Sequence, residues 1–391
     1  MNILVISHLY PQPHQPEFGI FVKQQIEELV RQGHSVQVVS PVGFVPKAVS
    51  WLSGKWRCTR RLAQHTRDGQ VEVYHPRCII LPRRLNYRGL GGQFYKAIRK
   101  VFRDSRFVPD IIHAHTAFPD GWAAMKFSRH INVPLVVTVH GQSFSNTLSR
   151  YPWAKSRIQK VYDNSATVTV SPSLWQKSEP YLQLARGTRV IPNGVNVVEE
   201  YGGTKKKKLI TFVGHLIPLK GADILIRAFS QLPVPLREGF KVAVTGDGRE
   251  LKNLQKLAWQ LKVAQAVDFT GPLPHHEVLK RLAVSQLFVL PSWNEGFGMV
   301  YLEALSQGTP IIACKHEGIS SYIKPGIHGW LVERKDVASL RAALIEALTG
   351  QEKLLEMGEE GRKLVLEEFT WQVNVRKYTE LYKTLRRTGN G

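Results

Sequence analysis

Residues 287–304 read LFVLPSWNEGFGMVYLEA, and this stretch indicates the fold class of the chain. The four residues 287–290 are all apolar, which is typical of a strand buried on both faces of a parallel sheet. Gly296 and Gly298 then open the backbone, and a helical pattern begins near Met299. The stretch predicts a strand, a loop and a helix in direct succession, which is the repeating unit of an α/β fold.

The same pattern recurs along the chain. Short apolar runs form two sets, separated by a tract of turn formers and charges at residues 199–208. The first set is 3–6, 36–39, 111–113, 135–139 and 168–170, and the second is 209–213, 242–245, 267–269, 287–290 and 310–313. Two such sets predict two doubly wound, Rossmann-like α/β domains that face each other across a cleft.

The turn formers Pro192-Asn193-Gly194 place the domain boundary nearby. We therefore expect an N-terminal domain over residues 1–190 and a C-terminal domain over 191–370. Residues 371–391 are predicted to form a closing helix that is amphipathic. Its apolar stripe comprises Val375, Tyr378, Leu381, Tyr382 and Leu385.

The net charge is +22 and it is unevenly distributed. Residues 1–190 carry 26 Lys and Arg against 10 Asp and Glu, whereas residues 191–391 carry 27 against 21. Much of the excess lies between Lys47 and Arg106, interleaved with aromatic residues. The cations there include Arg57, Arg60, Arg61, Arg83, Arg84, Arg88, Arg99, Lys100 and Arg103, and the aromatics are Trp51, Trp56, Tyr87, Phe94, Tyr95 and Phe102. This field favours an anionic partner such as a phospholipid surface; the alternative is a solvated basic surface that only aids solubility.

The three cysteines, Cys58, Cys78 and Cys314, are far apart in the sequence. A disulfide framework or a structural zinc site is therefore unexpected, and a reducing cytosol is the natural compartment. No apolar run reaches the roughly 18 residues that span a bilayer. The first residues predict a core strand rather than a signal peptide, so we expect a cytoplasmic protein.

In open α/β sheets, ligands bind at the carboxyl ends of the strands, so the loops there hold the candidate site residues. Glu295 lies just before the helix that begins near Met299, and Glu303 lies just over one turn inside it. Both carboxylates could accept hydrogen bonds from hydroxyls of a hexose or a ribose. The backbone N–H groups of Gly296, Phe297, Gly298 and Met299 could bind phosphate or sugar hydroxyls.

Two further loops offer groups suited to phosphate. Lys220, in the loop after strand 209–213, could neutralise a diphosphate leaving group, although a surface lysine is the alternative. Gly19 ends the loop after the first strand and would let a ligand approach the backbone, with a helix N-terminus behind it. An ordinary strand-to-helix turn is the alternative for Gly19.

Histidines follow two predicted strands. His140 directly follows the run 135–139 and would face the cleft, although a lone histidine is more often structural. For His113 and His115 a hydrogen-bonded architectural role is an equal alternative. The chain has no Asp-x-Asp triplet and no metal-site spacing of His, Cys and carboxylates, so we expect chemistry without a metal.

These segments together resemble glycosyltransferase family four, whose members are retaining enzymes with the two-domain GT-B fold. The resemblance covers nearly the whole chain and rests on the order and spacing of its segments. They are FGIFV (18–22), VTVHG (137–141), IPNGV (191–195), FVGHLIPLKG (212–221), EGFGMVYLEA (295–304) and the closing helix.

The resemblance implies a role for each candidate residue. Gly19 and its helix would approach the donor diphosphate, and His140 would lie beside the anomeric carbon of the donor sugar. Lys220 would bind the diphosphate. Glu295 would hold the sugar hydroxyls and Glu303 the ribose. The implied reaction is front-face transfer with retention, which needs no metal and no cofactor other than a UDP- or GDP-sugar as donor substrate.

His215 is a departure from the family, which usually has arginine there, and a histidine is smaller and often neutral at pH 7. It supports an alternative function, a catalytically decayed protein that binds sugar nucleotides or polyanions. Lys220, Glu295 and Glu303 are all present, which favours the enzyme. The N-terminal domain would receive a glycan or lipid-linked acceptor at the inner face of the cytoplasmic membrane. No nucleic-acid-binding signature is present.

Overall fold

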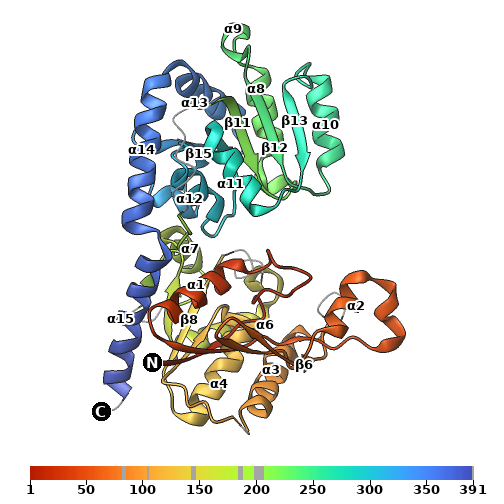
Figure 1. The fold of residues 1–391 in the computed structure, drawn as a ribbon, viewed down its shortest axis with the longest axis vertical. Coiled ribbons are helices and arrows are strands. Elements are labelled where there is room, and N and C mark those ends of the chain that lie inside the picture. The colour runs from red at the N-terminus through yellow and green to blue at the C-terminus, as the bar shows by residue number, and fades with distance from the viewer. Residues whose placement is uncertain (82–84, 104, 142–146, 184–187, 198–206, 390–391) are drawn as a thin grey trace. The chain divides into compact units, whose positions relative to one another are not determined.

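The structure is a computed structural model that describes residues 1–391 apart from 82–84, 104, 142–146, 184–187, 198–206 and 390–391. These residues form two compact units, residues 1–192 with 371–391 and residues 193–370. The sequence placed the changes at 190/191 and 370/371, and the units change at 192/193 and 370/371. Each unit has its own sheet with helices packed against it (Figure 1).

The first unit is built on a sheet with the strand order β10-β9-β8-β7-β1-β2-β5-β4. Every neighbouring pair in it is parallel except β4 and β5. The strands are β1 Asn2–Ile6, β2 Ser35–Val39, β4 His65–Asp68, β5 Val71–Tyr74, β7 Ile111–Ala114, β8 Leu135–Val139, β9 Ala166–Thr169 and β10 Arg189–Val190, with β3 Val42–Gly43 paired to β6 Arg77–Cys78 beside the sheet. The helices are α1 Ile20–Arg31, η1 Lys47–Leu52, α2 Gly54–Arg61, α3 Tyr87–Phe102, η3 Ala117–Gly121, α4 Trp122–Ile131, α6 Pro152–Tyr162, α7 Pro172–Ser178 and α15 Trp371–Gly389.

The second unit has a parallel sheet with the order β13-β12-β11-β14-β15-β16. Its strands are β11 Lys207–Val213, β12 Lys241–Thr245, β13 Val267–Gly271, β14 Ser285–Leu290, β15 Ile311–Cys314 and β16 Gly329–Val332. Its helices are η5 Pro218–Lys220, α8 Ala222–Ser230, α9 Val234–Arg237, α10 Leu251–Gln260, α11 His275–Val284, α12 Met299–Ser306, η6 Gly318–Ser321, α13 Val337–Thr349 and α14 Gln351–Glu368. Each of the ten apolar runs in the sequence overlaps an observed strand, so the α/β prediction is confirmed.

The closing helix α15 belongs to the first unit, although it follows the second in sequence. Four residues of its predicted apolar stripe are buried with β1, β2 and α1 in the core of that unit, and the fifth, Leu385, packs against this core partly buried. Asn374 fixes the start of the helix, because its side chain accepts a hydrogen bond from Gln25 (2.7 Å) and donates one to the Pro192 carbonyl (2.6 Å). These contacts carry the chain from the second unit back onto the first.

Candidate active site

The turn between β14 and α12 makes a helix N-terminus suited to an anion. Gly298 precedes the first residue of α12 and has φ +88°, a left-handed conformation that favours glycine. A β-carbon there would lie 2.6 Å from the Tyr301 ring. The first N–H groups of a helix have no partner within the helix and lie at the positive end of its dipole. The turn can therefore present amides to a phosphate or a sugar oxygen.

Lys220 and Glu295 form an ion pair beside this turn. The Lys220 ammonium lies 2.5 Å from the Glu295 carboxylate, and the side chains are only 17% and 15% exposed. Ser292 donates a second hydrogen bond to the same carboxylate oxygen (3.0 Å). The backbone N–H of Trp293 bonds the Leu219 carbonyl (3.0 Å), which ties the two loops together. A cation and a carboxylate predicted from separate segments therefore meet at one place.

A buried carboxylate that the sequence did not indicate supports Glu295 from behind. Glu317 is fully buried and accepts a hydrogen bond from the Glu295 backbone N–H (2.8 Å). The Arg334 guanidinium pairs with its other oxygen at 3.0 Å. A charged pair of this kind holds the loop in one conformation, because losing either partner would leave a buried charge uncompensated. The available sequence signal was the position of Glu317 just after a predicted strand.

Glu303 lies within α12 and has a different partner from Glu295. The His275 imidazole contacts the Glu303 carboxylate at 3.0 Å, and the Glu303 side chain is 15% exposed. His275 begins α11 and was not among the predicted site residues. It orients the carboxylate that the family resemblance assigns to the ribose.

The remaining predicted residues of the second unit differ in what they can offer. His215 is exposed to solvent. The Phe297 side chain is buried and packs against Tyr322 and Phe369, with ring centroids 6.0 Å away in each case. Because its side chain is buried, Phe297 can contact a ligand only through its backbone. The described residues contain no cluster of three or more His, Cys, Asp or Glu side chains arranged for a metal ion.

Gly19 begins α1 with φ +73°, and a β-carbon there would lie 1.7 Å from the Leu9 carbonyl oxygen. The loop's own backbone fills the space into which a side chain would point, and the approach of a ligand to this backbone stays a prediction. The glycine is needed to fold the loop after β1 onto the start of α1. The helix N-terminus itself remains a candidate for phosphate binding.

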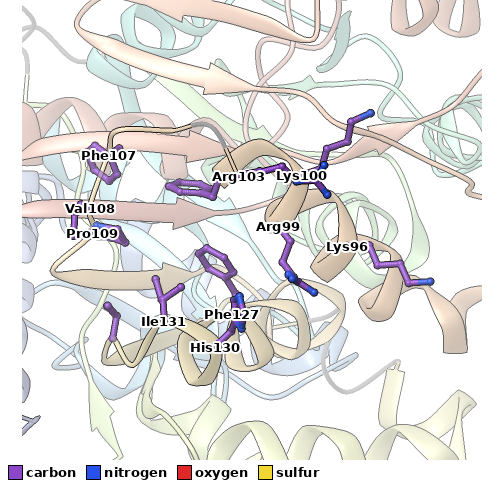
Figure 2. A pocket seen from close by; sticks show the side chains of 12 residues that line it. Lys96, Arg99, Lys100, Arg103, Phe107, Val108, Pro109, Phe127, His130 and Ile131 are labelled. Carbon is purple, nitrogen blue, oxygen red and sulfur yellow. The ribbon is translucent and has the colours of Figure 1, made fainter.

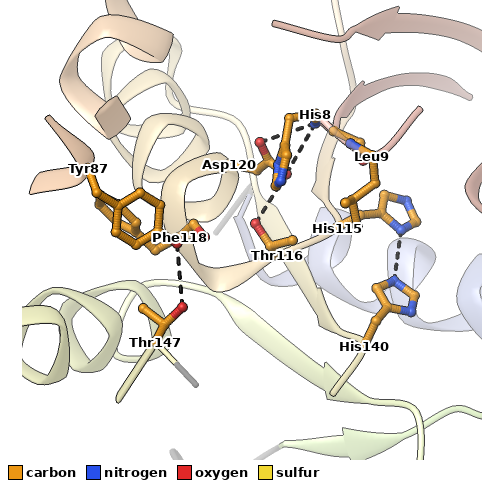
Figure 3. Close-up of polar contacts among 10 residues, drawn as sticks. His8, Leu9, Tyr87, His115, Thr116, Phe118, Asp120, His140 and Thr147 are labelled. Atoms are coloured by element: carbon orange, nitrogen blue, oxygen red, sulfur yellow. Dashed lines mark hydrogen bonds and ion pairs between the residues drawn. The ribbon is translucent and has the colours of Figure 1, made fainter. Parts of the chain in front are cut away.

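Polar side chains gather at the carboxyl ends of β1, β7 and β8 in the first unit (Figure 3). His140 follows β8 and lies 3.1 Å from His115, which follows β7. A second pair, His8 and Asp120, was not predicted: the imidazole lies 2.8 Å from the carboxylate, and Asp120 is fully buried. Thr116 also donates to Asp120 (3.1 Å). The position of His8 directly after the first strand was the only sequence signal for this pair.

A cavity of about 720 Å³ lies at the opposite, amino-terminal end of β7. Figure 2 shows Lys96, Arg99 and Lys100 of α3 on one side of it, and Phe107 and Val108 on the other. None of these three cations forms an ion pair with a described residue. The cavity therefore combines a basic wall with an apolar one, away from the loops that carry His115 and His140.

A group of exposed apolar side chains of the first unit lies on and beside α2, which projects from the sheet in Figure 1. We call residues 44–61 and 77–81 the α2 lobe, and its exposed apolar side chains are Phe44, Trp51, Leu52, Trp56, Ile79, Ile80 and Leu81. Arg77 anchors it by donating hydrogen bonds to the carbonyls of Thr59 (2.6 Å) and Leu62. No described helix is both long and apolar enough to cross a bilayer.

Two aromatic residues predicted for this surface are instead in the core. Tyr87 and Phe94 are 5% and 0% exposed, because they share the inward face of α3 with Leu90 and Ile98. Their assignment to a membrane-facing surface is wrong. Arg83 and Arg84 lie outside the described residues.

Comparison with known sequences identifies the family. Residues 19–199 match the profile of Glycosyltransferase Family 4, and residues 197–364 match that of Glycosyl transferases group 1. The D-inositol 3-phosphate glycosyltransferase of Corynebacterium urealyticum is 32% identical over 94% of this chain and 90% of its own length. TuaC of Bacillus subtilis, a glycosyltransferase provisionally assigned to teichuronic acid biosynthesis, is 26% identical over 99% of this chain and 100% of its own.

Solved structures share the fold. Sucrose-phosphate synthase from Thermosynechococcus elongatus superposes with a TM-score of 0.81 at 19% identity, over 99% of both chains. Anabaena HepE, solved in complex with UDP, gives 0.70 at 18% identity, over 98% of this chain and 100% of its own. The two units thus have the GT-B fold. The chain belongs to glycosyltransferase family 4, of the group 1 type, and is a glycosyltransferase.

Proposed function

We propose that the chain is a retaining, metal-independent glycosyltransferase that moves a sugar from a UDP- or GDP-sugar to a lipid-linked or polysaccharide acceptor in cell-surface glycan synthesis. The observation that carries the proposal is the Lys220–Glu295 pair beside the N-terminus of α12. It places a cation and a helix N-terminus, which suit a diphosphate, next to a carboxylate that can accept sugar hydroxyls.

In this proposal Lys220 and the first amides of α12 stabilise the charge that develops on the departing diphosphate. Glu295 accepts hydrogen bonds from hydroxyls of the donor sugar, and Glu303 accepts those of the ribose. The acceptor oxygen forms its bond to the anomeric carbon as the bond to the leaving phosphate breaks. The acceptor proton passes to a phosphate oxygen, so no protein nucleophile and no metal are required. His140 and the start of α1 would contact the donor sugar and its diphosphate.

Both nucleotide classes find support among relatives. The HepE structure holds UDP. A Corynebacterium glutamicum mannosyltransferase described as GDP-mannose-dependent is 31% identical over 50% of this chain. The donor is therefore proposed as a UDP- or GDP-sugar without a choice between them. The alternative of a decayed binding protein is disfavoured by the intact pair and by the buried Glu317 that supports it.

A panel of UDP- and GDP-sugars tests the proposal. At least one is expected to raise the melting temperature in EDTA by more than its free nucleoside diphosphate does, and this extra stabilisation, which the sugar supplies, should be lost in Glu295→Ala. Glu359→Ala is the matched control, because Glu359 is an exposed glutamate on α14 of the same unit. Proton NMR of a transferred sugar should show the anomeric configuration of the donor. Inversion would contradict retention, and stabilisation by a donor that is never turned over would favour the decayed sugar-nucleotide binder. Stabilisation by no donor would contradict the proposed transferase.

We also propose that the α2 lobe rests on an anionic membrane surface that presents the acceptor. The lobe exposes Trp51 at 69% and Leu52 at 57%, next to the exposed cations Arg57, Arg60 and Arg61. Aromatic and apolar side chains insert at the lipid interface while cations bind anionic headgroups. Binding to phosphatidylglycerol vesicles should fall with salt and with Trp51→Ser. The matched control is Trp259→Ser, since Trp259 is 74% exposed in the second unit. Binding insensitive to salt and to Trp51→Ser would refute this assignment.

A further inference from the structure

The two histidines at the carboxyl ends of β7 and β8 point a ring nitrogen at one another (Figure 3). Nδ1 of His115 lies 3.1 Å from Nε2 of His140, and the rings are nearly parallel, with an interplanar angle of 10°. Phe21 packs against His140 with a ring-centroid distance of 4.5 Å. The His140 ring is therefore fixed between an aromatic ring and a second imidazole.

His115 is held in turn by a buried network that reaches the closing helix. It stacks on His113 with a ring-centroid distance of 4.3 Å. His113 contacts the Thr138 hydroxyl through Nε2 (2.8 Å) and the Tyr382 hydroxyl through Nδ1 (2.8 Å). Thr138 also contacts the Tyr378 hydroxyl at 2.7 Å. Both ring nitrogens of His113 are thus bonded, which is an architectural role, whereas His115 is left to act on His140.

Burial keeps both members of the pair neutral at pH 7. It lowers the pKa of His115 to about 3, and burial followed by the neighbouring His115 lowers the pKa of His140 well below 6.5. A neutral imidazole has one N–H and one lone pair. The 3.1 Å contact needs one of each, so the tautomer of either ring determines the tautomer of the other.

Either His115 or His140 can donate the central hydrogen bond, and the two arrangements differ in which of the remaining ring nitrogens carries a proton. Nε2 of His115 and Nδ1 of His140 are both buried without a hydrogen-bond partner among the described residues. One of them must carry the proton that the central bond does not use. Both atoms are fully buried, so the exposure of the atoms themselves does not choose between them. The residues differ, because His115 is 1% exposed whereas His140 is half-buried, and a ligand reaches Nδ1 of His140 with the smaller rearrangement. An unpaired N–H is tolerated in the interior less often than an unpaired acceptor, so the proton is better placed on His140, which lies nearer the surface.

We propose that His115 is a positioning residue that donates its Nδ1–H to Nε2 of His140 and thereby makes His140 present Nδ1–H as a hydrogen-bond donor. The ligand group that this N–H fits is an oxygen acceptor, such as a hydroxyl or ring oxygen of the bound sugar. The identity of that ligand rests on the proposed function. The tautomer of His140 in the free protein is independent of the proposed function.

Nitrogen-15 NMR of the histidine side chains measures the tautomer directly in the full chain without ligand. The expected result is Nδ1–H on both His115 and His140; Nε2–H on His140, or an even mixture, would overturn the proposal. In His115→Leu, the His140 signals should shift towards the other tautomer, and in His115→Gln, whose amide keeps an N–H donor, they should stay closer to wild type. His75→Gln is the control, because His75 is another buried histidine of this unit outside the network and should leave the His140 signals unchanged.

Donor turnover gives a second readout. His115→Leu should lower kcat for donor hydrolysis about tenfold, which is the loss of one hydrogen bond of about 1.4 kcal/mol. The Kd for the free nucleoside diphosphate should stay within twofold of wild type, and His115→Gln should recover most of kcat. A wild-type chain that hydrolyses no donor would count against the proposed function alone, since the NMR result still decides the tautomer. Normal turnover in His115→Leu would overturn the positioning role alone.

Discussion

Glu295→Gln should tighten the binding of a free nucleoside diphosphate while slowing sugar transfer. In the structure, the Lys220 ammonium is already neutralised by the Glu295 carboxylate at 2.5 Å. A diphosphate must compete with that carboxylate for the same cation. Glutamine keeps an oxygen that can accept the Ser292 hydrogen bond but removes the competing charge. A nucleotide without a sugar loses nothing, because it does not use the sugar-binding role of Glu295.

The size of the gain follows from the geometry of the pair. Two unit charges about 4 Å apart attract by about 4 kcal/mol at an effective dielectric of 20. The Lys220 and Glu295 side chains are 17% and 15% exposed, so solvent weakens their attraction. We therefore expect a net gain of about 1–2 kcal/mol, which is about 5- to 30-fold in Kd.

Isothermal titration calorimetry of UDP and GDP measures this gain, with Glu359→Gln as the charge-matched control. Lys220→Met alone should weaken nucleotide binding, because the cation that both anions compete for is gone. Unchanged or weaker nucleotide binding in Glu295→Gln would refute the competition. So would nucleotide binding that Lys220→Met leaves unchanged.

His215→Arg should retain or raise donor turnover, because arginine adds a permanent bidentate phosphate donor at an exposed position; a loss of more than tenfold, or about 1.4 kcal/mol, in a turnover assay would contradict this. Phe297→Ala should destabilise the second unit by about 3–5 kcal/mol, because it removes a buried ring from contact with Tyr322 and Phe369; urea unfolding measures this, and a cost below 1 kcal/mol would disagree. Stability should also fall as the pH drops from about 6.5 towards 3. Burial lowers the pKa of His115 to about 3, so in this range the unfolded chain binds a proton that the folded one lacks, at about 1.4 kcal/mol per pH unit. His115→Leu should remove that share of the slope, and an unchanged slope in urea unfolding between pH 7 and 5.5 would exclude it.

The central strands of both sheets could be predicted because parallel strands covered on both faces are almost wholly apolar. The edge hairpin could not be predicted in the same way. Its strand β4, His65–Asp68, has no apolar residue and is paired on one side only, with β5. The turn signal Asp68-Gly69 was present, and Gly69 has φ +61°. Strand β16, Gly329–Val332, is short and begins at a glycine, so it gave no periodic signal.

The loops of the candidate site were predictable from their place after strands, but their partners were not. Glu317 contacts a residue 22 positions earlier, and Asp120 pairs with a residue 112 positions earlier. Such contacts depend on how strands are ordered in the sheet, which local sequence does not encode. Gly19 could be predicted to occupy a special turn, but its packing reason could not, because the glycine makes room for the Leu9 carbonyl, ten positions earlier in the loop.

Donor turnover in EDTA is the most direct measurement of the proposed activity. The full chain is incubated with each UDP- and GDP-sugar in turn, and release of the nucleoside diphosphate is followed beside Glu295→Ala and Glu359→Ala. We expect one donor to be cleaved without metal, with cleavage abolished in Glu295→Ala and retained in Glu359→Ala. Cleavage that requires an added divalent metal, or that survives in Glu295→Ala, would contradict a metal-independent transferase that holds its donor at the Lys220–Glu295 pair.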